Sequence, residues 1–559
     1  MAARSRPAAA PPARIADIGR DPAAQITVAE VIAAAAARAG VELAFTFPGG
    51  GSNLALLDAL EQYGVRTVLV RSEVGGGLMA STVADISGRP GLLVVGLGPG
   101  AASAINAVAH AWLDRSPLVV VADRYSQADE VTTGHQVLDQ RALYEPVTKA
   151  YVDGGPDDID EAIEGALRIA LEPPRGPVLV EVRRDRARLP AAPARASAHV
   201  DSPRVHDPEL LDRAARLVAA ARSPVILVGE EARRQLDPAV LVALAERLRA
   251  PVMTSYKAKG VFPESHRLAG GILTGAEIER PLLSESDLFL GVGLDPVELL
   301  ARPWPYEASI VALRLSGVPD PYLRPTLTLA GDLESSLAAI DCRVRTNASE
   351  WNEGEAAAHV TAMRDSLRAA DGALSAWRAV EIVQEIAGDA VVTVDAGAHM
   401  FAVTWFWRSE RPNRFHISNG LATMGFGVPA AIGAALNRPD ERVIAFTGDG
   451  GFTINAAELE TAVRAGAGVV VVVLNDASLS LIRVKQDALG LNRSNVDFVQ
   501  SNFATVADGL GAMGLRAVDE DELRDALHAA LAAAGPVVVD VVITGSEYAQ
   551  IHDRIRNPS

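Results

Sequence analysis

The feature that most constrains the fold is a regular alternation of short β-branched runs with longer alanine-rich segments. Runs such as GLLVVGL (91–97), PVILVG (224–229) and GVVVVVLND (468–476) are almost wholly apolar over the length of a strand. Each is followed by enough residues for one helix, which is the pattern of βα units in parallel sheets. We predict an α/β fold of three doubly wound parallel-sheet domains.

Chain length and two weakly patterned stretches set the predicted domain boundaries. The chain has 559 residues, enough for roughly three to four domains at about 150 residues each. The stretches 186–208 and 343–374 lack sustained periodicity and are typical of connections between packed units. We therefore predict a disordered tail at 1–22, an N-terminal domain at 23–190, a central domain at 205–345 and a C-terminal domain at 370–550.

Charge and cysteine content exclude several classes of function. The net charge is -18, so no overall positive field exists to attract nucleic acid. No run of about 18 uncharged apolar residues is present, so we expect no membrane-spanning helix. Cys342 is the one cysteine, which rules out an internal disulfide and fits a reducing cytoplasm. Catalysis must depend on other groups.

The strongest candidate site follows the apolar run RVIAFTGDG. Asp449 ends this strand within the turn Gly448-Asp449-Gly450-Gly451, and 27 positions later Asp476 ends the next strand. That spacing suits one helix and one strand, so the two carboxylates should lie at neighbouring strand ends. Mg²⁺ prefers oxygen ligands, and a glycine-rich turn offers N–H groups to phosphate. The sequence favours a metal-bound diphosphate; the alternative is a helix cap at Asp449 and an exposed acid at Asp476.

The unit from GDG to Asn-Asp resembles the cofactor motif of thiamine diphosphate-dependent enzymes. The resemblance implies that Mg²⁺ is held by Asp449, Asp476 and the backbone carbonyl of Ser478. Asp476 stands where the family more often has Asn, although catabolic acetolactate synthases can also carry Asp there. Further motifs in the family's order extend the resemblance over roughly 25–550, which implies a pyrimidine-binding, a central and a diphosphate-binding domain.

Three N-terminal segments carry the same resemblance. Glu73 in RSEVGGG follows an apolar strand, and the family's glutamate there contacts N1′ of the aminopyrimidine; the alternative is an acid at a helix N-terminus. The turn in FTFPGGGSN implies that Pro48 and Gly49 lie near the pyrimidine. HQVLDQ is similar to the His-Gln-x-x-Asp segment of acetolactate synthases, which implies that Gln136 contacts substrate.

Two C-terminal segments complete the candidate site. SNGLATMGFGVPAAIGAAL (418–436) is similar to the family segment beneath the bent cofactor, which implies that Met424 supports its V shape; the alternative is a core methionine. DAGAHMFA (395–402) aligns with a diphosphate-binding strand end, which implies roles for Gly397 and His399.

The implied activity is that of an acetolactate synthase-like carboligase, closest to the catabolic type. Such an enzyme decarboxylates a 2-oxo acid, with pyruvate the expected donor, and joins the enamine to a second carbonyl compound. A simple 2-oxo acid decarboxylase, a C–C lyase acting on another acyl substrate, and a catalytically silent relative remain alternatives. Thiamine diphosphate and Mg²⁺ are the implied cofactors, whereas FAD is doubtful because 251–271 carries no flavin fingerprint.

The resemblance also implies a particular assembly. In this family Glu73 would come from one chain, and Asp449 and Asp476 from its partner. We therefore expect a homodimer or homotetramer with its sites at the subunit interface.

Overall fold

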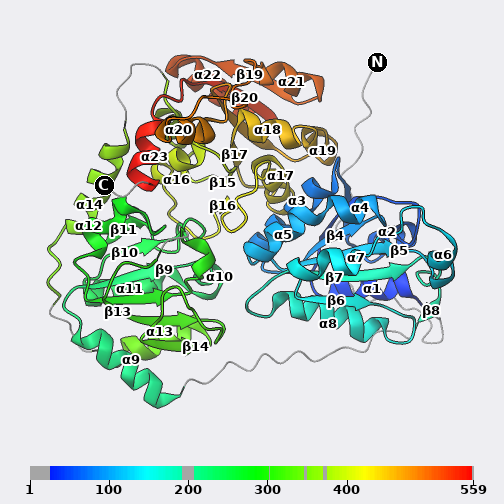
Figure 1. The fold of residues 1–559 in the computed structure, drawn as a ribbon, viewed down its shortest axis with the longest axis horizontal. Coiled ribbons are helices and arrows are strands. Elements are labelled where there is room, and N and C mark those ends of the chain that lie inside the picture. The colour runs from blue at the N-terminus through cyan, green and yellow to red at the C-terminus, as the bar shows by residue number, and fades with distance from the viewer. Residues whose placement is uncertain (1–25, 192–206, 301–302, 345–348, 369–373, 557–559) are drawn as a thin grey trace.

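The computed structural model describes residues 26–191, 207–300, 303–344, 349–368 and 374–556 (Figure 1). It contains three six-stranded sheets in which every neighbouring pair of strands is parallel. The predicted α/β class with three parallel sheets is confirmed. The tail predicted at 1–22 lies outside the described residues, and the domain boundaries stay predictions.

The N-terminal sheet has the strand order β3-β2-β4-β5-β7-β6. Its strands are β2 (Leu43–Phe47), β3 (Arg66–Leu69), β4 (Gly91–Val95), β5 (Leu118–Arg124), β6 (Ala150–Asp153) and β7 (Val178–Arg183). Its main helices are α1 (Val28–Arg38), α2 (Asn53–Gln62), α3 (Glu73–Ser87), α4 (Pro99–Ser103), α5 (Ile105–Leu113) and α8 (Ile159–Leu171). The short strands β1 (Ile26–Thr27) and β8 (Pro190–Ala191) pair antiparallel beside it.

The central sheet has the order β11-β10-β9-β12-β13-β14, so the direction of winding reverses between β9 and β12. Its strands are β9 (Pro224–Val228), β10 (Val252–Thr254), β11 (Ala269–Ile272), β12 (Leu288–Val292), β13 (Ser309–Arg314) and β14 (Leu327–Ala330). Its helices include α9 (Pro208–Ala220), α10 (Ala232–Gln235), α11 (Pro238–Leu248), α12 (Arg280–Leu283) and α13 (Leu333–Asp341).

The C-terminal sheet has the order β16-β15-β17-β18-β20-β19, which repeats the winding of the N-terminal sheet. Its strands are β15 (Val391–Val394), β16 (Phe415–Ile417), β17 (Val443–Gly448), β18 (Val469–Asn475), β19 (Met513–Ala517) and β20 (Val537–Val542). Its helices are α15 (Ala376–Ala387), α16 (His399–Phe406), α17 (Gly427–Asn437), α18 (Asp449–Asn455), α19 (Glu458–Ala465), α20 (Ser480–Ala488), α21 (Phe503–Gly509), α22 (Glu520–Ala532) and α23 (Tyr548–Arg556). Helix α14 (Glu355–Leu367) precedes them.

The two outer sheets share one hydrophobic core, which is formed where α3 packs on α17 (Figure 1). A Cβ at Gly433 would lie 2.7 Å from the carbonyl oxygen of Met79, so only glycine permits this helix spacing. Apolar burial drives this contact at about 25 cal/mol per Å². The contact holds the carboxyl ends of the two sheets in a fixed relation. None of the helices in the described ranges is long and apolar enough to cross a bilayer.

Candidate active site

A cavity of about 230 Å³ opens at the carboxyl end of the C-terminal sheet. It lies where the strand order reverses between β15 and β17, the place at which open parallel sheets bind ligands. All the C-terminal site candidates line it: Gly397, His399, Met424, Gly448, Asp449, Gly450, Gly451, Asp476 and Ser478. The structure thus brings these residues together, while the role of each stays a prediction.

Asp449 and Asp476 form the acidic wall of this cavity. Asp449 begins α18, and its carboxylate accepts hydrogen bonds from the Gly450 N–H (2.6 Å) and the Ser478 N–H (3.0 Å). The Asp476 carboxylate accepts a hydrogen bond from the Ser480 hydroxyl. Arg483 Nη2 lies 3.6 Å from Asp476 Oδ2. Burial raises the pKa of both carboxyls, and the charge of Asp449 contributes to the pKa of about 6 at Asp476. A bound cation would relieve this repulsion.

The donor set fits a hard divalent cation. Two carboxylates and the Ser478 carbonyl are oxygen donors of the kind that Mg²⁺ prefers, with remaining positions left to phosphate and water. In the described parts of the chain no three His, Cys, Asp or Glu side chains are grouped to hold a metal ion. A cation here would therefore depend on the backbone carbonyl and on oxygens of a bound cofactor.

His399 supplies an unsatisfied nitrogen to the same cavity. Its side chain is buried, and its Nε2 has no hydrogen-bond partner among the described residues. Burial lowers the pKa of His399 to about 4, so the ring is neutral near pH 7. A Cβ at Gly397 would lie 2.7 Å from His399 Cε1, and one at Gly448 would lie 3.0 Å from its Nδ1. Glycine at both positions leaves room for the imidazole ring. A phosphate oxygen is a suitable hydrogen-bond partner for its Nε2.

The Met424 side chain lies against the GDGG turn at 448–451. A Cβ on Gly450 would lie 3.3 Å from Met424 Cε, so the thioether is in contact range of the turn. The position is half-buried and faces the cavity. An adaptable apolar side chain here suits support of a ligand from one side.

Asp395 is a site residue that sequence reasoning missed. This fully buried carboxylate follows β15 and accepts N–H groups of Gly425 (2.8 Å) and Phe426 (3.2 Å) and the Thr447 hydroxyl (3.0 Å). Burial raises the pKa of Asp395 to about 6. It links the end of β15 to the turn at 425–426 and to β17, next to the cavity. Its place directly after an apolar strand was a usable signal.

Tyr548 is a second missed residue, and the sequence carries no local signal for it. This buried residue begins α23 and lines the cavity beside Asp476. Burial raises the pKa of Tyr548, and the charge of Asp476 adds to the rise. The last helix of the chain therefore covers one side of the site.

The N-terminal candidates do not line this cavity but gather along their own loop at 96–100. A Cβ at Gly49 would lie 3.0 Å from Gly96 Cα, and the Gln136 carbonyl oxygen would lie 2.7 Å from a Cβ at Gly98. Glu73 Oε1 would lie 3.2 Å from a Cβ at Gly100. Pro48 is exposed next to Gly49, and the Gln136 side chain is exposed. The N-terminal sheet thus presents a separate cluster where its strand order reverses between β2 and β4.

The loop that leads into Glu73 is fixed by the C-terminal half of the same chain. Ser72 caps α3, and its hydroxyl accepts the Gly75 N–H. The buried carboxylate of Glu458 accepts the N–H groups of Arg71 (3.2 Å) and Ser72 (3.0 Å). Burial raises the pKa of Glu458, and these hydrogen bonds oppose the rise. Glu73 therefore projects from an anchored helix start.

The reversal point of the central sheet is filled by its own side chains. The sheet has the strand order of dinucleotide-binding folds. Glu298 accepts the N–H groups of Glu230 (2.9 Å) and Asp295 (3.2 Å) together with the Ser255 hydroxyl. These backbone groups follow β9 and β12, where a dinucleotide phosphate would bind. A dinucleotide phosphate at this point would have to displace the Glu298 carboxyl group from these N–H groups.

Three family models match the chain in the order of its sheets. They are described as the thiamine pyrophosphate enzyme N-terminal TPP binding domain (residues 26–143), central domain (211–340) and C-terminal TPP binding domain (395–541). Together they cover each of the three sheets in large part.

Curated relatives match over nearly the whole chain. Acetolactate synthase of Bacillus subtilis (strain 168) is 30% identical over 547 residues, 93% of this chain and 93% of its own length. Probable 2-ketoarginine decarboxylase AruI of Pseudomonas aeruginosa is 30% identical over 542 residues, 93% and 94% of the two chains. Acetolactate synthase of Mycobacterium bovis is 30% identical over 560 residues, 93% and 88%. The chain therefore belongs to the thiamine diphosphate-dependent enzymes and is an acetolactate synthase-like member of that family.

Proposed function

We propose that this protein is a carboligase that decarboxylates pyruvate and joins the remaining two-carbon unit to a second 2-oxo acid. When bound, thiamine diphosphate supplies the nucleophilic carbon and the electron sink that decarboxylation requires. The observation that carries the proposal is that one chain contains two half-sites. The C-terminal half-site has acidic and histidine side chains suited to a metal-bound diphosphate, and the N-terminal half-site has Glu73.

The C-terminal half-site would hold the diphosphate end. Asp449, Asp476 and the Ser478 carbonyl would coordinate Mg²⁺, since buried carboxylates this close favour a bound cation. The unpartnered Nε2 of His399 would face a phosphate oxygen and donate to it in the tautomer that carries the ring proton on this nitrogen. Met424 would hold the two rings of the cofactor at the angle the reaction needs.

The N-terminal half-site of a second chain would complete the active site. Glu73 would hydrogen-bond the aminopyrimidine and manage its proton, a task suited to a carboxyl shielded from water. Large apolar side chains remain exposed beside both halves: Phe47 (45%), Leu54 (52%), Ile454 (55%), Ile482 (44%) and Phe498 (47%). Burial of such side chains is typical of subunit interfaces. We propose a homodimer as the smallest active unit.

Substrate would bind above the cofactor, next to the loop that bears Gln136. This exposed side chain offers an uncharged amide donor to a carboxylate or carbonyl oxygen. The Bacillus and Mycobacterium relatives are named as acetolactate synthases, which supports acetolactate as the product.

A second candidate function is decarboxylation without carbon–carbon bond formation. The Pseudomonas relative, which matches over an equal share of the chain, is named as a probable 2-ketoarginine decarboxylase. Both activities use the same cofactor and the same first step, so they differ in what the site admits as the second reactant.

We further infer that the enzyme works without a flavin. The carboxyl group of Glu298 accepts hydrogen bonds from the N–H groups that would otherwise bind a dinucleotide phosphate. Flavoproteins absorb near about 450 nm through the isoalloxazine ring of the cofactor. The purified enzyme should lack this absorbance; a stoichiometric band at that wavelength would overturn the inference.

One experiment separates the candidate functions. The purified enzyme is incubated with thiamine diphosphate, Mg²⁺ and single 2-oxo acids, and products are identified by mass spectrometry. Formation of 2-acetolactate from labelled pyruvate is the expected result. Conversion of pyruvate to acetaldehyde alone, or turnover only of a guanidino 2-oxo acid, would favour the decarboxylase.

A further inference from the structure

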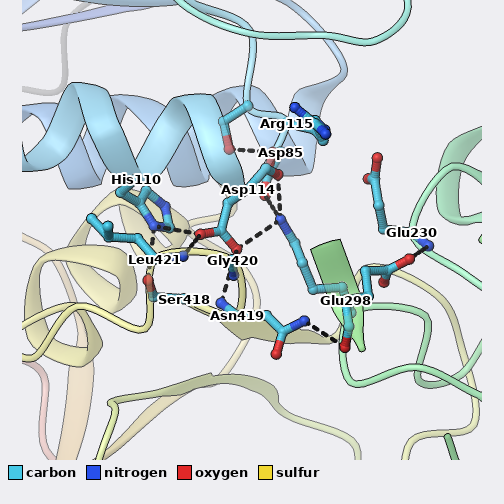
Figure 2. A network of polar contacts seen from close by, with 12 residues as sticks. Asp85, His110, Asp114, Arg115, Glu230, Glu298, Ser418, Asn419, Gly420 and Leu421 are labelled. Atoms are coloured by element: carbon cyan, nitrogen blue, oxygen red, sulfur yellow. Dashed lines mark hydrogen bonds and ion pairs between the residues drawn. The ribbon is translucent and has the colours of Figure 1, made fainter. Parts of the chain in front are cut away.

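A buried polar network joins the N-terminal, central and C-terminal parts of the chain (Figure 2). It contains Asp85 of α3, His110 of α5, Glu298 from the turn after β12, and the turn at 418–421 that follows β16. The N–H groups of this turn donate hydrogen bonds to one carboxylate, that of Asp114, whose side chain is 0% exposed. The network lies outside the cavity and is not used by the proposed reaction.

Asp114 holds the turn by its backbone. Its Oδ1 accepts the N–H groups of Asn419 (2.9 Å) and Gly420 (3.2 Å), and its Oδ2 accepts that of Leu421 (3.3 Å). Successive N–H groups that converge in this way usually bind a free anion. Here the anion is the side chain of the residue that caps the end of α5, far from the turn along the same chain.

The carboxylate is kept ionised by Lys257 of the central sheet. Lys257 Nζ lies 3.3 Å from Asp114 Oδ1 and 3.7 Å from Asp85 Oδ2, and it donates to the Asp114 carbonyl (2.5 Å). Burial alone would raise the pKa of Asp114, but the charges of Lys257 and His110 hold it well below its ordinary value. A charged acceptor makes stronger hydrogen bonds to the turn than a neutral one.

The turn cannot move away from Asp114 without loss of packing. A Cβ at Gly420 would lie 2.5 Å from the Leu113 carbonyl oxygen, so the backbone of the turn lies directly on the end of α5. The His110 Nδ1 lies 3.0 Å from both Asp114 Oδ2 and Ser418 Oγ. The Ser418 hydroxyl also accepts the Thr423 N–H (3.1 Å).

Met424 lies three residues after this turn, and the backbone that follows Met424 is held by a second buried carboxylate. Asp395 accepts the N–H groups of Gly425 and Phe426, just as Asp114 accepts those of residues 419–421. We propose that Asp114, with Lys257 as its counter-ion, is a positioning residue that fixes Met424 beneath the cofactor. The inference rests on the proposed cofactor site and adds a role for the N-terminal and central domains of the same chain.

The test compares Asp114→Asn with a matched control, Glu279→Gln. Glu279 is also a buried carboxylate that accepts successive N–H groups, those of Thr274, Gly275 and Ala276, but it lies within the central domain. Asp114→Asn should weaken thiamine diphosphate binding, read by tryptophan fluorescence with Mg²⁺ present, by at least about tenfold. Glu279→Gln should lower the melting temperature and leave the binding constant unchanged.

Hydrogen exchange of the cofactor-free protein gives a readout independent of the cofactor. Amides of 418–424 should exchange faster in Asp114→Asn, while those of α17 stay protected. The double variant Asp114→Asn, Lys257→Met also removes the Lys257 charge, which only Asp85 would then balance, but its asparagine still lacks the second carboxylate oxygen that accepts the Leu421 N–H. It should therefore regain thermal stability without regaining cofactor affinity. Should Asp114→Asn not fold, Gly420→Ala lifts the turn without unpairing any charge and should weaken binding in the same way.

Cofactor binding within about twofold of wild type in the variants that fold would overturn the inference. So would an equal loss of affinity in Glu279→Gln, or full recovery of affinity in the double variant, because either result indicates general stability alone. Failure of the wild-type enzyme to bind thiamine diphosphate would instead overturn the proposed function.

Discussion

Asp449 and Asp476 are neighbouring buried carboxylates with different partners. Asp449 is hydrogen-bonded to backbone N–H groups at a helix start, whereas Asp476 is paired with Ser480 and Arg483. An amide could replace Asp476 as an oxygen donor, but the helix start and the cation both require the charge of Asp449.

We therefore predict that Asp449→Ala abolishes Mg²⁺-dependent binding of thiamine diphosphate, measured by isothermal titration. Asp476→Asn, the matched variant, should bind within about tenfold of wild type, because the amide keeps an oxygen ligand. Equal losses in the two variants would contradict this division of roles.

Glu298 provides a pH-dependent prediction. Burial raises its pKa to about 8 from an ordinary value of 4.5, so the folded protein holds this proton more tightly than the unfolded chain. The resulting stabilisation is complete below about pH 4.5 and is lost as pH rises through about 8, by at most about 1.4 kcal/mol per pH unit.

Glu298→Gln removes this titration and keeps an acceptor for the Glu230 N–H. Its melting temperature relative to wild type should therefore rise steadily between pH 5 and pH 8.5, by differential scanning fluorimetry. The raised pKa values of Glu231 and Glu279 act equally in both proteins. A difference that stays constant with pH would refute the assignment.

Residues directly after strong strands could be predicted from the sequence. Gly397, Asp449 and Asp476 end apolar runs, and parallel strands bring such ends to one edge. Tyr548 and Asp114 could not be found in this way, because their partners lie far along the chain and their local sequence is ordinary.

Among the elements, strands that read as apolar runs were predicted, and three less regular strands were not. β18 (Val469–Asn475) is buried throughout and reads as an apolar run. β16 has only three residues, β11 contains two glycines, and β19 is an edge strand that is largely accessible. Periodicity cannot identify segments this short, since tertiary pairing rather than local preference defines them.

Helix α23 gives a prediction at the scale of an element. It is preceded by Gly545, whose φ is +61° and whose Cβ, if present, would collide with Asp476 Oδ2. Gly545→Ala should displace Asp476 and weaken Mg²⁺ binding, measured by titration of the cofactor-dependent fluorescence change.

Gly490→Ala is the matched control for this variant. Gly490 has a similar φ of +64° and open space around its Cβ position. Both variants incur about 1–2 kcal/mol of backbone strain, but only Gly545→Ala should change metal affinity. An unchanged affinity in Gly545→Ala would show that α23 does not set the position of Asp476.

At the scale of the whole molecule, we propose that two chains build each active site. One chain presents Glu73 on the N-terminal sheet and Asp449 on the C-terminal sheet in separate clusters. The shared core of α3 and α17 fixes the distance between them within a chain. A symmetric dimer would place the Glu73 cluster of each chain against the Asp449 cluster of its partner.

Glu73→Gln and Asp449→Ala should each inactivate the homodimer. A heterodimer with one chain of each kind, isolated through two different affinity tags, would have one site with both changes and one site with neither. Its activity per dimer should be about half that of wild type, because one intact site remains. An inactive heterodimer would show that Glu73 and Asp449 serve the same chain's site and would contradict the account.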